Sequence, residues 1–265
     1  MTTNPRPLAL VTGASSGIGA QLARELARDG HDLILCARRV ERMQALADEF
    51  KAMGAACTII AADLGKSGAA AGLVREIEAK VLVVDVLINA AGLGGQGRFH
   101  KSDPQRIGEM LQLNVVTLTE LTRLVLPGMV RRGRGHVMLL SSTAAFQPGP
   151  NMAVYCASKA YVLSFGQAIA YEVRNTGVSV TTLCPGATAT EFAEVASVAN
   201  SALFKGSMIP VMSASEVARI GYRGLKARRS VVITGLLNRI MAISSRLSPT
   251  ALTLRIASWM MSAAR

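Results

Sequence analysis

Two residues of the segment YCASK, at positions 155–159, have the types and the spacing needed for proton transfer. Tyr155 and Lys159 are four positions apart, so on a helix they share one face and lie one turn from each other. A tyrosine hydroxyl, with a pKa near 10, is a weak base at neutral pH. An ammonium about 4 Å away stabilises the phenolate by roughly 4 kcal/mol at an effective dielectric constant of about 20. We therefore expect Lys159 to lower the pKa of Tyr155, so that the phenol exchanges a proton with an alcohol or carbonyl oxygen.

A serine is placed to complete this pair. Ser142 stands thirteen residues before Tyr155, at the end of a predicted strand over residues 136–141. Because the carboxyl ends of parallel strands face the ligand crevice, its hydroxyl could polarise the substrate oxygen; a turn-forming serine is the alternative. A second YxxxK pattern begins at Tyr222, but the residue thirteen positions before it is Ile209, whose side chain cannot hydrogen-bond. We interpret the second pattern as a coincidence.

A glycine-rich turn, TGASSGIG at residues 12–19, follows the first predicted strand (8–11) and opens the first predicted helix (18–28). Such a turn brings backbone N–H groups and a helix N-terminus against a pyrophosphate, with no Cβ atom in the way. Glycine is common in ordinary strand–helix turns, but the position at the first strand favours a dinucleotide site. The sequence contains no GxxxxGK[ST] pattern, which argues against a P-loop nucleotide hydrolase.

Two arginines follow the second predicted strand, residues 32–37. A site for NAD usually places an acidic residue here to bind the ribose 2′-hydroxyl, but no acid occurs before Glu41. The guanidinium groups of Arg38 and Arg39 match a 2′-phosphate in charge and geometry. The pattern predicts NADP(H) rather than NAD(H). The alternative, two solvated residues at a helix start, applies more readily to Arg39 than to Arg38.

These residues belong to an alternating series of predicted strands and helices. The strands are 8–11, 32–37, 57–61, 84–89, 136–141, 178–184 and 230–234. The helices are 18–28, 40–53, 69–80, 104–129, 152–174, 213–225, 236–247 and 249–261. This order predicts an α/β fold, a Rossmann-like doubly wound parallel sheet of about seven strands with helices on both faces. With no linker or repeat visible, we expect one domain over residues 1–265.

The composition fits such a domain. Of the 265 residues, 50% are hydrophobic and 17% are charged, which excludes a disordered chain. The four cysteines are scattered without a CxxC pair, so we expect neither a disulfide scaffold nor a metal site. The polar N-terminus lacks the pattern of a secretory signal, and no run approaches the roughly 18 apolar residues of a spanning helix. We expect a cytoplasmic protein.

Taken together, six motifs resemble those of the short-chain dehydrogenase/reductase (SDR) family, with its NADP-dependent members most similar. They are TGASSGIG (12–19), ADL (62–64), NAAG (89–92), LLSS (139–142), YCASK (155–159) and PGATAT (185–190), in family order over about four-fifths of the chain. The resemblance implies an oxidoreductase that acts on CH–OH groups with a nicotinamide cofactor. It also implies a homo-oligomer, a dimer or tetramer.

The resemblance further implies roles for single residues. Ser142, Tyr155 and Lys159 would be catalytic, with Asn114 holding a water for a proton relay. Lys159 would also bind the nicotinamide ribose, Asp63 the adenine and residues 185–190 the nicotinamide, while Asn89 would brace the sheet. The expected cofactor-binding residues are Gly13, Ser15, Ser16, Gly17, Ile18, Gly19, Arg38, Arg39, Asp63, Leu64, Asn89, Ala91, Tyr155, Lys159, Pro185, Gly186, Thr188 and Thr190. Ala90 departs from the family's usual NNAG, which affects a local hydrogen bond rather than the reaction.

The C-terminal part of the chain is basic and apolar. From Val217 to Arg265 there is no Asp or Glu but there are nine Lys and Arg residues, in a chain of net charge +12. The two last predicted helices form a C-terminal extension, residues 236–265. Three alternatives stay open: a cap on the core or on a partner subunit, a membrane-surface helix pair, or a wall of the substrate pocket. Nucleic-acid binding is not expected, because aromatic residues make up only 4% of the chain.

The sequence therefore predicts an NADP(H)-dependent oxidoreductase for a hydrophobic substrate, such as a ketone, a steroid-like ring or a fatty acyl chain. Residues 188–210, which include Leu203 and Met208, would form a lid over an apolar pocket, as the resemblance also implies. The competing hypothesis is a non-catalytic protein, either a dinucleotide sensor or a scaffold at a membrane surface. An intact Ser–Tyr–Lys set argues against it, because a sensor has no need of a tuned phenol.

Overall fold

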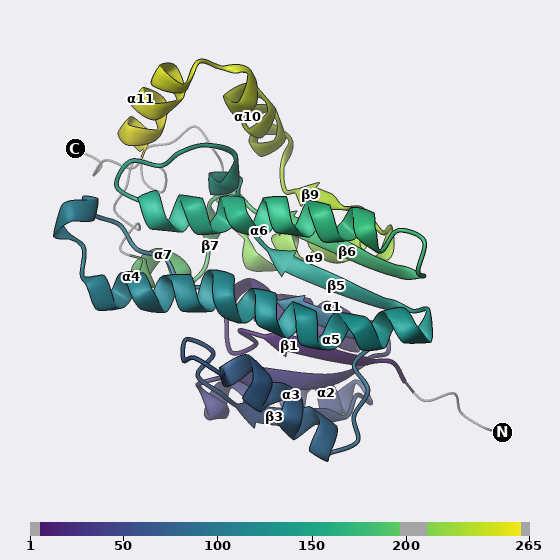
Figure 1. Ribbon diagram of the computed structural model, residues 1–265. Coiled ribbons are helices and arrows are strands. Elements are labelled where there is room, and N and C mark those ends of the chain that lie inside the picture. The colour runs from purple at the N-terminus through teal and green to yellow at the C-terminus, as the bar shows by residue number, and fades with distance from the viewer. Residues whose placement is uncertain (1–5, 197–210, 261–265) are drawn as a thin grey trace.

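The computed structural model describes residues 6–196 and 211–260 and contains one large parallel sheet (Figure 1). Its strands are β1 (Leu8–Thr12), β2 (Asp32–Ala37), β3 (Cys57–Ala61), β4 (Val86–Asn89), β5 (Gly135–Leu140), β6 (Val178–Cys184) and β9 (Val231–Ile233). They pair in the order β3-β2-β1-β4-β5-β6-β9, every neighbour parallel. The predicted fold class is confirmed. Because the chain runs outward from β1 in both directions, the crevice between β1 and β4 is the expected ligand site.

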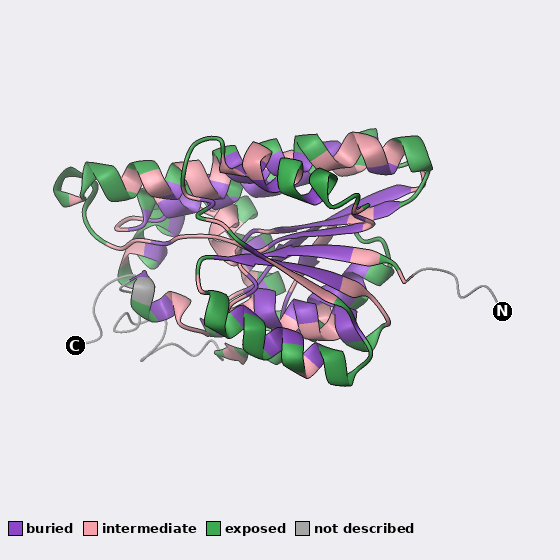
Figure 2. Ribbon diagram, turned by 90° about the horizontal axis from the view of Figure 1, so that it is seen from below, coloured by how far each residue is buried: buried purple, intermediate pink, exposed green. Residues whose placement is uncertain are grey.

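Helices cover both faces of this sheet. They are α1 (Gly17–Arg28), α2 (Val40–Ala52), α3 (Ala69–Ala79), α4 (Pro104–Leu111), α5 (Leu118–Arg132), α6 (Ala153–Glu172), α7 (Phe192–Val195), α9 (Ala214–Lys226), α10 (Leu236–Leu247) and α11 (Thr250–Met260). The short strands β7 (Thr188–Ala189) and β8 (Met212–Ser213) form a separate parallel pair. Figure 2 shows the strands of the large sheet mostly buried, whereas the helices expose their outer faces.

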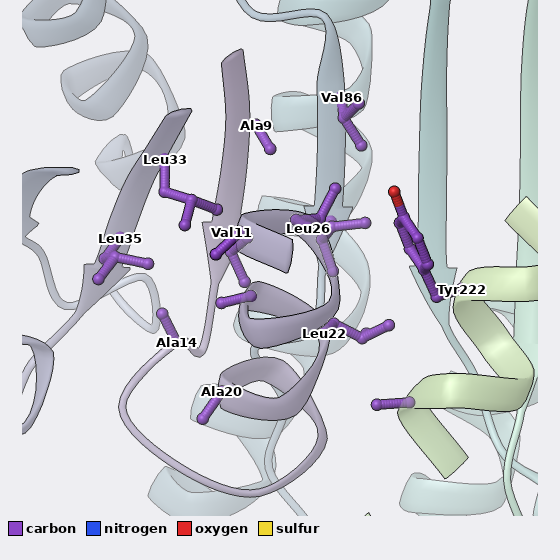
Figure 3. Packing of buried hydrophobic residues seen from close by; sticks show 14 of the residues in the cluster. Ala9, Val11, Ala14, Ala20, Leu22, Leu26, Leu33, Leu35, Val86 and Tyr222 are labelled. Atoms are coloured by element: carbon purple, nitrogen blue, oxygen red, sulfur yellow. The ribbon is translucent and has the colours of Figure 1, made fainter. Parts of the chain in front are cut away.

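Each face of the sheet packs against its own hydrophobic cluster. On one face, α1, α2 and α9 cover the strands, and on the other α3, α5 and α6 do so. Leu22 and Leu26 are fully buried because they follow one face of α1, and Figure 3 shows them between β1 and the Tyr222 ring. Burial on both faces explains why the strands read as continuous apolar runs.

The second YxxxK pattern has a structural role away from the site. The Tyr222 hydroxyl donates to Asp29 at 2.6 Å, and the Lys226 ammonium lies 2.8 Å from the same carboxylate. Asp29 ends α1, so the pair fastens α9 to α1. Partial burial tends to raise the pKa of Asp29, but hydrogen bonds from Lys226 and Tyr222 outweigh this effect and hold the pKa below its usual value.

The helix predicted over residues 104–129 differs from expectation in its middle. A π-helical turn, Gln112–Thr117, separates α4 from α5. Asn114 and Thr117 lie in this turn and are both buried. Helix-period reasoning alone does not detect such a turn.

One helical stretch of the described chain, Pro104–Arg132, is long and apolar enough to cross a membrane by length and composition. The α5 part of it packs on β4, β5 and α3, so we interpret it as a helix that covers the sheet. Of the predicted lid over 188–210, the structure shows β7 and α7, and residues 197–210 lie outside the described part.

Candidate active site

A cavity of about 530 Å³ opens at the carboxyl ends of the strands, at the predicted crevice. The loops that follow β1, β2, β3, β4, β5 and β6 all line it. Every predicted cofactor-binding residue lines this cavity except Asn89, and so do three of the four predicted catalytic residues. Asn114 is the fourth and lies behind the wall.

The glycine-rich turn forms a cradle that side chains would fill. Gly13 has φ +65°, and a Cβ atom there would lie 2.8 Å from the Ala91 nitrogen. A Cβ at Gly19 would lie 2.4 Å from the Gly13 carbonyl oxygen. The turn can therefore pass close to the β4 loop only with glycine at both positions. Its backbone stays open at the start of α1, as a bound pyrophosphate requires.

Thr12 holds the neighbouring NAAG loop in place. Its hydroxyl accepts hydrogen bonds from the backbone N–H groups of Ala90 (3.1 Å) and Ala91 (3.2 Å) and donates to the Ile88 carbonyl. Asn89, buried behind the loop, donates to the Thr122 hydroxyl at 3.0 Å. The loop is thus anchored through its backbone, which is why alanine is tolerated at position 90. The importance of Thr12 was not recognised from the sequence.

The two arginines after β2 differ in their surroundings. Arg38 is exposed at the cavity. Arg39 donates to the hydroxyls of Ser15 (3.2 Å) and Ser16 (2.8 Å) and pairs with the carboxylate of Glu191 at 2.8 Å. Arg39 is the N-cap residue of α2 and is partly exposed, and its guanidinium also binds the glycine-rich turn.

Glu191 is a site residue that sequence reasoning missed. It lies 152 positions from Arg39 in the chain and pairs with both Arg39 and Arg42. Hydrogen bonds from Arg42 and Arg39 hold its pKa below the usual value. No local pattern could have revealed this contact, because it joins α2 to the segment just before α7.

The loop after β3 forms another part of the cavity wall. The Asp63 carboxylate lines the cavity and accepts a hydrogen bond from the Gly65 backbone at 3.1 Å. The Leu64 carbonyl accepts from the Thr117 hydroxyl at 2.8 Å, so the π-helical turn supports this loop. Asp63 and Leu64 both line the cavity, and their contacts with a cofactor stay predictions.

Three predicted catalytic side chains meet in the cavity. Tyr155 and Lys159 lie one turn apart on α6, and both are buried. Ser142 follows β5. Its hydroxyl accepts from the Ala144 N–H and donates to the Pro185 carbonyl at 3.4 Å, and it lies close enough to the Tyr155 phenol to affect the pKa of that group. The Lys159 ammonium donates to the Leu140 carbonyl at 2.8 Å and lies 5.8 Å from the centre of the Tyr155 ring.

The electrostatics of this group differ from the sequence-based expectation. Burial raises the pKa of the Tyr155 phenol, although the hydrogen bond with Ser142 opposes the change. Burial also lowers the pKa of Lys159 to about 8. The pKa of the phenol is therefore raised, whereas the spacing of Tyr155 and Lys159 led us to expect that it is lowered. Desolvation penalises both charged forms, and the ammonium is directed at Leu140 rather than at the phenol oxygen.

Asn114 supports the site from behind. It is fully buried, donates to the Leu93 carbonyl (2.8 Å) and the Ser158 hydroxyl (3.1 Å), and accepts from the Leu93 N–H (2.9 Å). Ser158 in turn donates to the Tyr155 carbonyl at 2.7 Å. A Cβ atom placed on Gly92 would lie 3.4 Å from the Asn114 oxygen and 3.5 Å from the Lys159 nitrogen. Asn114 thus lies near the ammonium, and its water-holding role stays a prediction.

The far end of the cavity is mainly apolar. The Phe192 ring of α7 lies 5.4 Å from the Tyr155 ring, centre to centre, and packs in a small cluster with methionines and alanines. Residues of α10 and α11 complete the wall, and sequence reasoning named none of them individually. They are Asn238, Met241, Ala242, Ser245 and Ala257. The inner faces of the C-terminal extension therefore support the pocket-wall alternative.

In the described ranges, no cluster of three or more His, Cys, Asp or Glu residues has an arrangement that could hold a metal ion. The four cysteines are free thiols. Burial raises the pKa of Cys156, which lines the cavity beside Tyr155, to about 11. We therefore assign no role in catalysis to this thiol.

Comparison with known proteins identifies the family. The model of the short chain dehydrogenases matches residues 7–200. The NADP-dependent 3-hydroxy acid dehydrogenase YdfG of Salmonella typhi is 37% identical over 190 residues, which are 71% of this chain and 75% of the relative. The chain belongs to the short-chain dehydrogenase family, and it is an oxidoreductase of that family, as its motifs predict.

Solved structures agree with this assignment. A short-chain dehydrogenase from Sphingobium yanoikuyae in complex with NADPH is 33% identical, with a TM-score of 0.80 over 90% of this chain and 92% of that one. The bulky-bulky ketone specific alcohol dehydrogenase from Comamonas testosteroni is 29% identical, with a TM-score of 0.76 over 92% and 93%. Each of these two structures therefore matches nearly the whole chain.

Proposed function

We propose that this protein interconverts a carbonyl and a secondary alcohol on a hydrophobic substrate with NADP(H). One observation carries the proposal. The same cavity is lined by a glycine cradle and two arginines and by the group of Ser142, Tyr155 and Lys159, of which Tyr155 and Lys159 are buried. A dinucleotide that binds across the crevice, with its phosphates at the glycine turn, can place its nicotinamide beside Tyr155 and Lys159.

The residues present fit NADP(H). The open backbone of residues 15–19 receives the pyrophosphate, Arg38 and Arg39 receive the 2′-phosphate, and Asp63 lies on the adenine side. The segment 185–190 closes the nicotinamide end. When bound, the cofactor supplies or accepts hydride at the substrate carbon. NADP-dependent relatives and NADPH-bound structures support the same cofactor.

The chain's own residues handle the proton. Since burial keeps the Tyr155 phenol protonated, it is poised to donate to the substrate oxygen as a carbonyl is reduced. The Ser142 hydroxyl, which lies close to the phenol, orients that oxygen. The Lys159 ammonium, next to the phenol, stabilises the phenolate left behind and binds the ribose. Asn114 fixes the turn that carries Tyr155 and the loop around Leu93.

The wall opposite the phenol favours an apolar substrate. Phe192, Met152, Met241 and Ala257 provide apolar surface, and Asn238 and Ser245 add a few polar groups. We therefore propose a ketone, steroid-like or acyl substrate, in line with a similar structure described as specific for bulky-bulky ketones. Because α10 and α11 line the same cavity as the family motifs, we propose that residues 236–265 belong to one catalytic domain with the rest.

A reduction assay tests the proposal. Ketones and acyl thioesters are offered to the full-length protein, and the loss of NADPH absorbance is followed. Tyr155→Phe should lower turnover by roughly 100-fold or more, because it removes the general acid, while NADPH binding measured by fluorescence stays the same. Tyr222→Phe is the matched control, since it changes the tyrosine of the other YxxxK pair and should keep turnover. Turnover retained by Tyr155→Phe would contradict the assigned role.

A further inference from the structure

Helix α10 has an unusual distribution of apolar side chains. Leu236, Ile240, Ile243 and Leu247 recur at intervals of four, three and four residues, so they lie on one face of the helix. Their exposed fractions are 75%, 54%, 53% and 83%. A surface helix normally turns such a stripe toward the core, whereas α10 turns it outward.

The opposite face of α10 is fixed at the cavity. Asn238 is buried and donates to the Thr234 carbonyl at 2.7 Å, and Ala242 is buried beside it. The Ser245 hydroxyl lies 3.3 Å from the Phe146 carbonyl oxygen, to which it donates. These contacts set the rotation of the helix about its axis. The apolar stripe therefore faces outward as a consequence of the packing.

Helix α11 repeats the arrangement. Leu252, Ile256 and Trp259 follow one another at intervals of four and three residues and are 50%, 47% and 62% exposed. Ala257, on a different face, is buried and lines the cavity. Figure 1 shows α10 and α11 together outside the helical layers that cover the sheet. We call these two sets of exposed apolar side chains, one on each helix of the C-terminal extension, the outer stripes.

The charges beside the outer stripes have one sign. Arg239, Arg246 and Arg255 are exposed on the same two helices, and no acidic residue occurs from Val217 to Arg265. A second copy of the chain placed face to face would bring arginine against arginine. A surface with negative charge and an apolar interior complements both features, and tryptophan and arginine are typical residues of such a boundary.

We propose that α10 and α11 dock the protein on an anionic lipid bilayer. The outer stripes enter the boundary between headgroups and acyl chains, and the arginines stay at the level of the phosphates. Docking in this orientation places the cavity wall formed by the inner faces of the same helices next to the lipid. The proposal concerns where the protein binds, and it holds whatever substrate the site accepts.

Vesicle flotation with the full-length protein tests the proposal. Phosphatidylcholine vesicles with and without phosphatidylglycerol are the two probes, and binding is expected only with phosphatidylglycerol and should weaken in high salt. Ile240→Ser with Ile243→Ser should weaken binding roughly tenfold or more, because less apolar surface enters the lipid. Arg239→Glu with Arg255→Glu should weaken it by roughly fivefold or more for each arginine.

A control variant carries one change of each kind elsewhere. Val81→Ser alters an exposed apolar residue just after α3, and Arg75→Glu alters an exposed basic residue on α3, a helix that lies far from α10 and α11 in Figure 1. This variant should bind vesicles as the wild type does. Thermal unfolding and NADPH binding are measured for every variant, so that a folding defect is separated from a loss of docking.

Three outcomes would overturn the proposal. The first is no flotation with either vesicle, and the second is equal binding by the stripe variants and the wild type. The third is a change of oligomeric state in sedimentation for the Ile240→Ser and Ile243→Ser variant with vesicle binding unaltered, which assigns the outer stripes to a second copy. Because reductase activity is not the readout, failure here leaves the proposed reaction intact.

Discussion

Replacing the buried lysine of the site should make the cofactor-free protein more stable. Lys159 is 4% exposed, and its ammonium has one hydrogen bond to a protein acceptor in the described structure, to the Leu140 carbonyl. Burial lowers its pKa from 10.5 to about 8, so the fold disfavours the charged side chain. Lys159→Met keeps an unbranched side chain of similar length without the charge.

The size of the effect follows from the pKa difference. A shift of this extent corresponds to about 3 kcal/mol by which the charged lysine destabilises the fold at neutral pH. Loss of the hydrogen bond to Leu140 offsets about 1 kcal/mol of the gain. The free energy of unfolding should therefore rise by about 2 kcal/mol, which is roughly 4–8 °C in Tm for a chain of this size.

The pH dependence of stability provides a second, independent test of the same reasoning. Between about pH 8 and 10.5 the unfolded wild-type chain binds the lysine proton more tightly than the folded one. The free energy of unfolding of the wild type therefore rises with pH through this window, and the destabilisation is fully present below about pH 8. The Lys159→Met variant lacks this rise, so the two proteins should converge in stability at high pH.

Thermal and urea unfolding at a series of pH values measure both effects. Lys226→Met is the matched control, because it removes the lysine of the other YxxxK pair, which is exposed and bound to Asp29. It should not raise Tm. A lower Tm for Lys159→Met at pH 7, or a constant difference from the wild type up to pH 10.5, would refute the reasoning that burial of the ammonium destabilises the fold.

Three other substitutions have defined outcomes. Arg38→Asp should weaken NADPH binding roughly tenfold or more relative to NADH, because it removes a charged partner of the 2′-phosphate, and equal losses in titrations with both cofactors would contradict this. Glu191→Gln should strengthen NADPH binding severalfold, since Arg39 loses a competing carboxylate, and weaker binding in the same titration would count against the competition. Tyr222→Phe should lower the free energy of unfolding by about 1 kcal/mol through the lost bond to Asp29, with kcat unchanged.

Much of the fold could be predicted from local sequence. The glycine turn is identifiable because only glycine fits the approach of Gly13 to Ala91, a constraint visible in residue type. The order of strands and helices follows from runs and periodicities of a few residues. That Ser142 and Tyr155 lie close together was predictable. Ser142 follows the carboxyl end of a strand, and Tyr155 is near the start of the next helix, which begins at the same edge of a parallel sheet.

Other features depend on contacts between distant segments. The π-helical turn at Asn114 leaves no mark in helix periodicity, and the pairing of Glu191 with Arg39 joins residues 152 positions apart. The rotation of α10, which turns Asn238 inward, is set by packing on the cavity.

The amino-acid sequence by itself determined which groups we propose for the chemistry and which strands and loops hold them, because residue type and spacing act locally. The tertiary structure decided their protonation. The pKa of Tyr155 is raised and that of Lys159 is lowered by burial, which arises only when α6 packs against the sheet and water is excluded from both side chains.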